Sequence, residues 1–132
     1  MSEPFIFINS FEIKEGKLEG LRHFLGEFFT TVEANEPRLL GINAYVNEDG
    51  TEVSFVHVHP DAASMEHHEK VAHEHTERAR REFLDATTSL QVYGQPSDVL
   101  LEGTRQLAGT GVPLSVKPED LGGFTRLVAA AG

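Results

Sequence analysis

The spacing of apolar residues changes five times within the first hundred positions, and this limits the fold more than any other feature. Residues 5–13 are dense in β-branched and aromatic side chains, which is typical of a largely buried strand. Apolar side chains then recur at steps of three and four over residues 18–32, as on one face of a helix. Residues 39–46 and 53–59 again favour strands. The Asn-Glu-Asp-Gly segment between them predicts a hairpin turn, because glycine adopts the positive φ that closes it.

A second, longer helix is predicted from Asp61, its expected N-cap, to about residue 86. A strand over residues 87–93 follows it. The order strand, helix, strand, strand, helix, strand is that of the split ferredoxin-like unit, an α+β arrangement. The face of the second helix predicted to lie against the sheet carries Met65, His68, Ala72, His75 and Ala79.

The sequence predicts one domain, at residues 1–96, and a C-terminal extension at residues 97–132. The chain of 132 residues is long enough to bury a sizeable core. Within the extension we expect a short helix near 97–106 and a brief extended piece at 114–116. We expect this arm to pack on the core or on a partner subunit through Leu114, Val116, Phe124 and Leu127.

The predicted strands do not alternate cleanly between apolar and polar residues. Phe5, Ile6, Phe7 and Ile8 follow one another directly. Continuous apolar runs are typical of strands buried on both faces. Because helices cover only one face of a lone four-stranded ferredoxin-like sheet, we expect a second copy to cover the other face. The sequence therefore predicts a homodimer.

Composition argues against several classes of partner and site. A formal net charge of −10 disfavours nucleic acid and anionic membrane surfaces, which need a basic face. The absence of cysteine excludes disulfides, thiolate nucleophiles and cysteine metal sites. No apolar run approaches the roughly 20 residues of a membrane span, and no basic signal-peptide region opens the chain. We expect a cytoplasmic protein without nucleic-acid or membrane partners.

Three short sequence patterns occur within residues 4–96, each in or next to a predicted strand or at the start of a predicted helix. They are Asn9-x-Phe11-x-Ile13-x-x-Gly16, Glu36-Pro37-x-x-x-Gly41 and Asp61-Ala-Ala-Ser-Met65. With the order of elements, they resemble the antibiotic-biosynthesis-monooxygenase family of the dimeric α+β barrel superfamily. The resemblance implies a dimer with facing sheets and a pocket between each sheet and its helices. Family members include cofactor-free oxygenases of quinols and aromatic polyketides, haem-degrading enzymes, and proteins without a known reaction.

Asn9 is the most specific residue that the resemblance carries. In the haem-degrading branch an asparagine at this place hydrogen-bonds inside the pocket, together with a tryptophan and a histidine on the second long helix. Here His68 stands where that tryptophan would be, and Arg78 stands near the place of the histidine. The sequence thus departs from that branch at two of three places. An asparagine near a strand end also bonds to turn backbone, and this alternative stays open for Asn9.

The seven histidines do not have the spacing of a metal site. Two helical ligands normally stand four positions apart, whereas His68 and His75 are separated by about 10.5 Å of helical rise. His57 and His59 share one face of a strand. We therefore expect no bound metal. His68 and His75 either line a pocket or pack as half-buried core residues.

The remaining chemistry is acid–base work by histidine and asparagine in an aromatic-lined cavity, since no Gly-x-Ser-x-Gly elbow or phosphate-binding glycine motif is present. A histidine can take the proton of a phenol or hydroquinone near neutral pH. The resemblance implies that the resulting anion reacts with oxygen without metal or flavin.

We therefore predict a cofactor-independent monooxygenase of a small aromatic or quinol substrate. The alternatives are a non-catalytic ligand-binding dimer and a haem-binding or haem-degrading protein. The predicted catalytic residues are Asn9, His68 and His75, and the predicted substrate-binding residues are Phe7, Phe28, Tyr45, Phe55 and His57.

Overall fold

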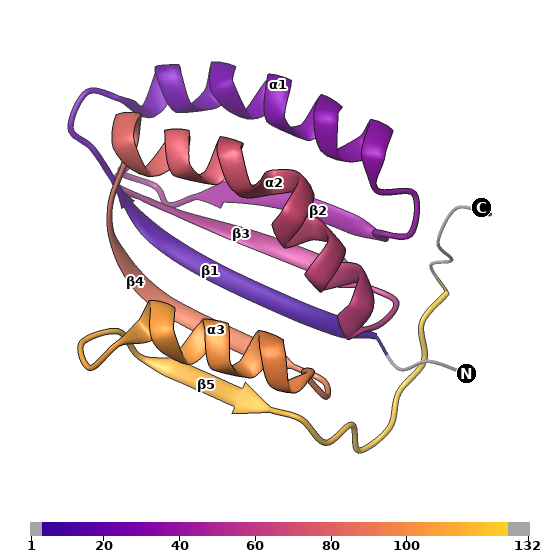
Figure 1. Cartoon of the computed structure of the whole chain (residues 1–132). Helices are drawn as coiled ribbons and strands as arrows, with labels where there is room; N and C mark the ends of the chain where they lie inside the picture. The colour runs from indigo at the N-terminus through magenta and orange to yellow at the C-terminus, as the bar shows by residue number, and fades with distance from the viewer. Residues whose placement is uncertain (1–3, 127–132) are drawn as a thin grey trace.

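The computed structural model describes residues 4–126 and consists of one five-stranded sheet with helices on one of its faces (Figure 1). The strand order is β2-β3-β1-β4-β5, with β1 antiparallel to both of its neighbours and β5 parallel to β4. α1 and α2 lie side by side over the sheet, and α3 lies beside them along β4 and β5. The strands are β1 (Phe5–Ile13), β2 (Gly41–Val46), β3 (Glu52–His59), β4 (Leu84–Tyr93) and β5 (Leu114–Lys117), and the helices are α1 (Leu18–Asn35), α2 (Ala62–Glu82) and α3 (Asp98–Ala108).

This α+β arrangement confirms the predicted ferredoxin-like fold, with a difference at the end of the second long helix. α2 ends at Glu82 instead of near residue 86, and β4 begins at Leu84 instead of residue 87. Phe83 is buried with its ring centroid 5.3 Å from that of Phe24, and its carbonyl accepts a hydrogen bond from the Lys14 N–H at 2.8 Å. Leu84 then pairs with β1 opposite Ile13. Tertiary packing thus ends the helix although the sequence spacing continues.

Side-chain caps fix where two of the helices begin. The Asp61 carboxylate accepts a hydrogen bond from the Ser64 N–H at 3.0 Å, as predicted for the N-cap of α2. Ser97 caps α3 in the same way, because its hydroxyl accepts from the Leu100 N–H at 3.2 Å. Each cap satisfies one N–H group of the first helical turn that has no partner within the helix.

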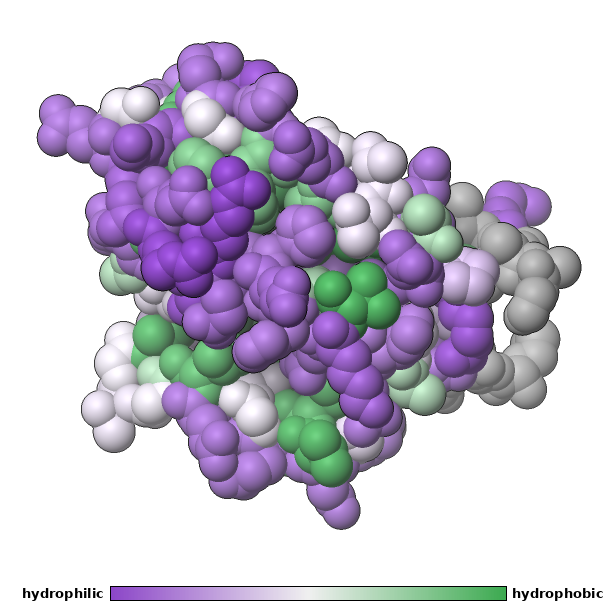
Figure 2. Space-filling model, turned by 45° about the horizontal axis from the view of Figure 1, so that its top comes forward, coloured by the Kyte–Doolittle hydropathy of each residue, from purple (hydrophilic) through white to green (hydrophobic). Residues whose placement is uncertain are grey.

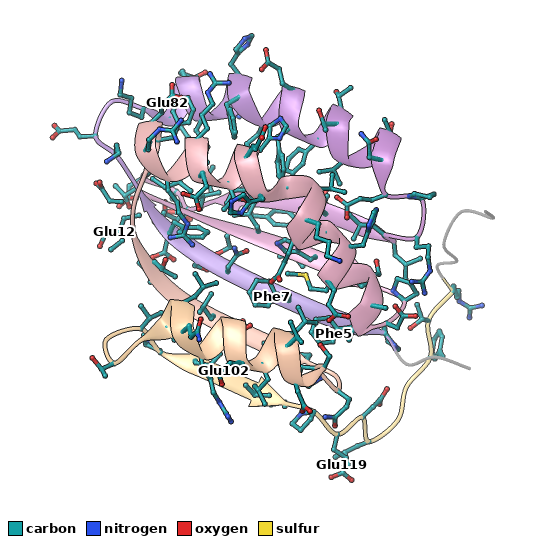
Figure 3. All side chains as sticks on the ribbon, in the orientation of Figure 1. Phe5, Phe7, Glu12, Glu82, Glu102 and Glu119 are labelled. Carbon is teal, nitrogen blue, oxygen red and sulfur yellow. The ribbon has the colours of Figure 1, made fainter. Side chains whose placement is uncertain are left out.

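The core has two parts, both on the helical side of the sheet. The first lies between α1, α2 and the half of the sheet around β3 and β1, and it is rich in phenylalanine. The second lies between α3, the start of α2 and strands β1 and β4. Phe5 and Phe7 of β1 belong to the second part, and Figure 3 places them between the ribbons of α2 and α3.

The opposite face of the sheet is not covered by any element within residues 4–126. The side chains of β3 alternate strictly, with buried residues toward the helices and Glu52, Ser54, Val56 and Val58 half-buried on the other side. This single chain therefore buries one face of its strands, not both. An apolar band nevertheless runs across the open face through Ile6, Ile8, Val56 and Val58.

The C-terminal extension adds α3 and β5 to the ferredoxin-like unit. Leu114 and Val116 pack against the second part of the core. Phe124 is 82% exposed, and Leu127 lies outside the described residues. Contact of this arm with a partner subunit stays a prediction.

The surface on the helical side is mainly hydrophilic, and its hydrophobic residues form separate patches (Figure 2). No helix in residues 4–126 has both the length and the apolar character needed to cross a membrane.

Candidate functional site

Four titratable side chains are buried between the sheet and the helices: Glu36, His57, His59 and His68. His57 and His59 are two positions apart on β3, so both point toward the helices. His68 lies on the buried stripe of α2. Glu36 follows the last residue of α1, which ends there because Pro37 disfavours helical geometry at the residue before it. Three elements thus bring one carboxylate and three imidazoles together.

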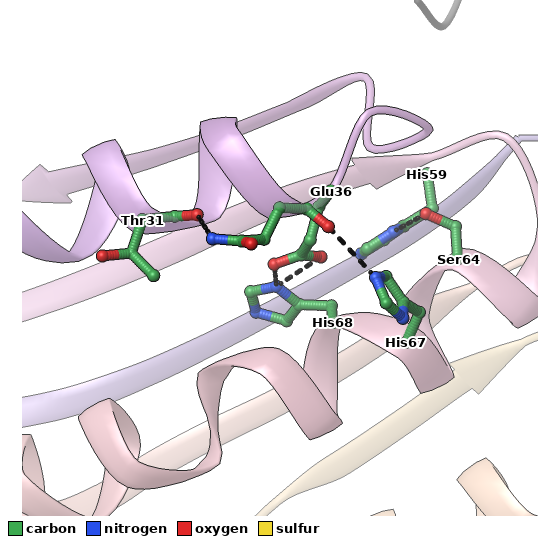
Figure 4. A network of polar contacts seen from close by, with 7 residues as sticks. Thr31, Glu36, His59, Ser64, His67 and His68 are labelled. Carbon is green, nitrogen blue, oxygen red and sulfur yellow. Dashed lines mark hydrogen bonds and ion pairs between the residues drawn. The ribbon is translucent and has the colours of Figure 1, made fainter. Parts of the chain in front are cut away.

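Glu36 and His68 form a buried pair (Figure 4). The His68 Nδ1 atom lies 3.0 and 2.9 Å from the two carboxylate oxygens of Glu36. A carboxylate only accepts, so Nδ1 carries the hydrogen and donates. The Nε2 atom of His68 is therefore the nitrogen that remains for a substrate. Outside this pair, the His67 Nε2 atom lies 3.2 Å from the Asn35 carbonyl oxygen, a second link between α1 and α2.

The three imidazoles form a compact triangle. The His68 ring centroid lies 4.9 Å from that of His57 and 5.9 Å from that of His59, and the last two are 6.0 Å apart. Burial, followed by the nearby His68 and His59, lowers the pKa of His57 well below its ordinary value. Burial, followed by His68, lowers the pKa of His59 to about 3. Both are therefore neutral at neutral pH, and within this triangle His68 alone is hydrogen-bonded to a carboxylate.

A chain of contacts anchors His59 at the start of α2. The His59 Nδ1 atom lies 2.8 Å from the Ser64 hydroxyl oxygen. Ser64 is tied through its backbone to Asp61, and Asp61 forms an ion pair with Arg38. The hydrogen bond from Arg38 lowers the pKa of the Asp61 carboxyl. These contacts join β3 to α2 and position the helix that carries His68.

An apolar cavity of about 50 Å³ adjoins the pair, between α1, α2 and the sheet. By this measure of cavity volume one water molecule needs about 10–15 Å³, so the cavity holds roughly four water molecules. The space suits one six-membered ring or a chain of similar bulk, and is too small for a porphyrin. The lining residues are Asn9, Phe11, Phe24, Leu25, Phe28, Ile42, Phe55, His57, His68, His75, Thr76, Ala79, Arg80 and Leu84.

Asn9 points into this cavity from the centre of β1. The His57 Nε2 atom lies 3.2 Å from the Asn9 side-chain oxygen, which can only accept, so Nε2 of His57 donates. The amide NH₂ group of Asn9 is then left as a donor toward the cavity. The same assignment leaves the buried His57 Nδ1 atom without a partner among the described residues. An unpaired buried polar atom costs about 1–3 kcal/mol, which is typical of a site built for more than stability.

Six of the eight predicted site residues line the cavity: Asn9, Phe28, Phe55, His57, His68 and His75. His75 is half-buried, with its ring centroid 6.0 Å from that of Phe24 and 5.3 Å from that of Phe28.

Phe7 and Tyr45 lie elsewhere, and we remove them from the proposed site. Phe7 packs in the second part of the core, although its ring makes an edge-to-face contact with His57 at a centroid distance of 5.5 Å. Tyr45 is 61% exposed on the open face of β2, because the neighbouring Ala44 faces the helices.

The sequence prediction missed Glu36 as a site residue. The apolar stripe of α1 runs through Phe28 and Val32, and the next position on it, four residues on, is Glu36. An acidic residue at an inward position was the available signal. Within residues 4–126, no group of three or more histidine, aspartate or glutamate side chains is arranged to hold a metal ion.

No protein-family model matches the sequence, and no curated protein is significantly similar to it. Among solved structures, MupZ from Pseudomonas fluorescens has a TM-score of 0.72 at 21% identity, covering 96% of this chain and 99% of MupZ. Protein SO0527 from Shewanella oneidensis has a TM-score of 0.60 at 21% identity, covering 70% and 91%. A Bacteroides thetaiotaomicron protein provisionally named an antibiotic biosynthesis monooxygenase has a TM-score of 0.56 at 16% identity, covering 68% and 85%. These similarities confirm the predicted resemblance at the level of the fold. The 96% of this chain that aligns with MupZ includes most of its C-terminal extension.

Proposed function

With an antibiotic-biosynthesis-monooxygenase-like fold as the premise, we propose that this protein is a cofactor-independent monooxygenase of a small aromatic or quinol substrate. The observation that carries the proposal is the buried Glu36–His68 pair beside an apolar cavity of the size of one ring. A histidine oriented by a carboxylate is a recurrent general base in enzymes.

In the first step, the Nε2 atom of His68 takes the proton of a phenolic hydroxyl. Glu36 keeps the proton on Nδ1 and stabilises the imidazolium that forms, an effect that is large because the pair is buried. The amide NH₂ group of Asn9 donates a hydrogen bond to the phenolate oxygen. The cavity thus holds an electron-rich anion between one base and one donor.

In the second step, the anion gives its electrons to molecular oxygen. The balance is RH₂ + O₂ → RO + H₂O: a substrate carbon gains one oxygen atom, and the second oxygen leaves as water with two substrate hydrogens. The substrate supplies all the electrons, so no external reductant is needed. The apolar walls formed by Phe24, Phe28 and Phe55 exclude bulk water from the reactive anion.

Oxygen uptake by a panel of single-ring hydroquinones tests this function. We expect oxygen uptake to be faster than autoxidation in a control without protein, with one O₂ consumed per substrate molecule. With ¹⁸O₂, we expect one ¹⁸O atom in a newly hydroxylated product. A protein that binds the hydroquinones in the cavity without accelerating oxygen uptake would instead be the non-catalytic ligand-binding alternative, and the proposal would be wrong.

We also propose that the protein is a homodimer that packs its open sheet faces together. Ile8 and Val56 are directly paired across β1 and β3 at the centre of the apolar band on this face. We expect Ile8→Lys to yield a folded monomer at micromolar concentration, because the dimer would bury an unpaired charge. Val99→Lys, at a 70% exposed position of α3, is the matched control and should stay dimeric. Sedimentation velocity with circular dichroism makes the measurement, and a monomeric unmodified protein contradicts the proposal.

A further inference from the structure

One cationic side chain, Arg80, lines the cavity described above. It is half-buried, whereas Arg78 and Arg81 beside it on α2 are exposed. Its guanidinium carbon lies 5.1 Å from the centroid of Phe11, another residue of the cavity wall. The guanidinium is therefore held at the cavity by an aromatic ring, which leaves its five N–H donors to other groups.

Arg80 has no ion pair and no side-chain hydrogen bond among residues 4–126. Nearby basic residues do have acidic partners. The Arg78 Nε atom lies 2.7 Å from a carboxylate oxygen of Glu82, and the Lys14 Nζ atom lies 2.9 Å from Asp85. Arg80 differs from these two residues in having no acidic partner among the described residues.

The helix dipole does not account for this arrangement. Cations in the last turn of a helix stabilise it, and this benefit applies equally to Arg80 and Arg81. It gives no reason for Arg80 to be half-buried at an apolar cavity while Arg81 remains in solvent. A free guanidinium in a ligand cavity matches the planar, bidentate geometry of a carboxylate.

The position of Arg80 also constrains the shape of the ligand. His68 and Arg80 are twelve positions apart on α2, which corresponds to roughly 18 Å along the helix axis. This rise separates the backbone positions only, because long helical side chains lean toward the helix N-terminus and both side chains line the same cavity. A ligand that contacts both therefore has its reacting ring near His68 and carries its charge on a side chain that reaches Arg80. The chain's net charge of −10 opposes anion binding only weakly at this site, because salt screens charges beyond about 8 Å.

We infer that Arg80 is a specificity residue that binds a carboxylate, carried on a flexible chain by the aromatic substrate. The inference rests on the proposed function for the place of the ring at His68. It adds the substrate class: single-ring phenols or hydroquinones with a carboxylate-terminated side chain. The ring packs among Phe24, Phe28 and Phe55, and the carboxylate accepts hydrogen bonds from the half-buried guanidinium of Arg80 beside the ring.

Binding under anaerobic conditions tests this inference separately from turnover. The probes are ω-(2,5-dihydroxyphenyl)alkanoates of increasing chain length, each compared with its methyl ester by isothermal titration calorimetry. We expect the acid to bind about tenfold or more tightly than the ester once the chain is long enough to reach Arg80, the scale of a charge-assisted hydrogen bond. The preference should weaken at high salt.

Two variants assign the preference to its residue. Arg80→Gln should bring the ratio of acid to ester affinity to about one, and Arg81→Gln, the matched control, should keep it. Equal affinities of acid and ester in the unmodified protein, binding of neither, or a preference that survives in Arg80→Gln overturns the inference. If the protein binds the acid more tightly than the ester but does not oxidise it, only the proposed function is contradicted. If it oxidises acid and ester with equal efficiency, only this inference is contradicted.

Discussion

Replacing His68 with glutamine is expected to reduce turnover of a hydroquinone by about 10²-fold or more, the scale for losing a general base. Glutamine has a similar bulk and its amide can still donate to Glu36, but it cannot take up the substrate proton. The measurement is the initial rate of oxygen uptake over a range of substrate concentrations, with the melting temperature as a check on folding. We expect kcat to fall more than KM rises, because the lost interaction belongs to the transition state.

Glu36→Gln is expected to act in the same direction, since the neutral amide cannot stabilise the imidazolium as a carboxylate does. The double variant should be little slower than either single variant, because residues that act as a unit are not additive. His67→Gln, on the exposed neighbouring position of α2, is the control and should retain activity. Full turnover in both His68→Gln and Glu36→Gln would show that the pair is structural and would contradict the proposed role.

Alanine is the less suitable substitution at position 68. His68→Ala would leave the carboxylate of Glu36 buried without its partner, and removal of one member of a buried pair costs about 3–5 kcal/mol. Loss of folding would then be mistaken for loss of catalysis. The glutamine variant separates the two effects because it keeps a donor at the same place.

The fold could be predicted from the sequence because the changes between helical and strand periodicity are sharp. Residues on the buried stripe of α2, such as Met65 and His68, and the N-cap at Asp61 followed directly from spacing. The end of α2 did not, because Ala79 and Ala86 continue the helical spacing. The early end of the helix depends on Phe83 packing against Phe24, a contact between residues far apart in sequence.

The candidate site could be predicted in part for the same reason. His57, His68 and Asn9 each lie on a face that local periodicity defines, so their direction toward the helices was predictable. The pairing of His68 with Glu36 joins α2 to the end of α1 and depends on how the two helices cross, which no local pattern encodes. Tyr45 was misplaced because its aromatic ring suggested a cavity wall, whereas Ile42 and Ala44, which alternate with it along β2, face the helices.

Lowering the pH from 7 to 5 is expected to reduce the free energy of unfolding by up to about 4 kcal/mol through His57 and His59 alone. Burial keeps the pKa of both imidazoles low in the folded protein, to about 3 for His59. In the unfolded chain the same groups titrate near their ordinary value of about 6.5. The unfolded state therefore binds more protons in this range, and stability falls as the pH falls. Each group contributes up to about 1.4 kcal/mol per pH unit once the pH is below 6.5.

Urea unfolding followed by circular dichroism at pH 5, 6, 7 and 8 measures this dependence, at one protein concentration so that any dimer equilibrium is held constant. Above pH 5 most carboxylates stay ionised in both states, so the slope reports histidine. The double variant His57→Gln/His59→Gln should lose most of the slope whatever its absolute stability, whereas His23→Gln, an exposed position on α1, should keep it. An unchanged slope in the double variant would mean that the folded protein protonates these imidazoles as readily as the unfolded chain does. In that case His68 would not be the one proton acceptor of the cluster, and the assignment of the general base would have to include His57 and His59.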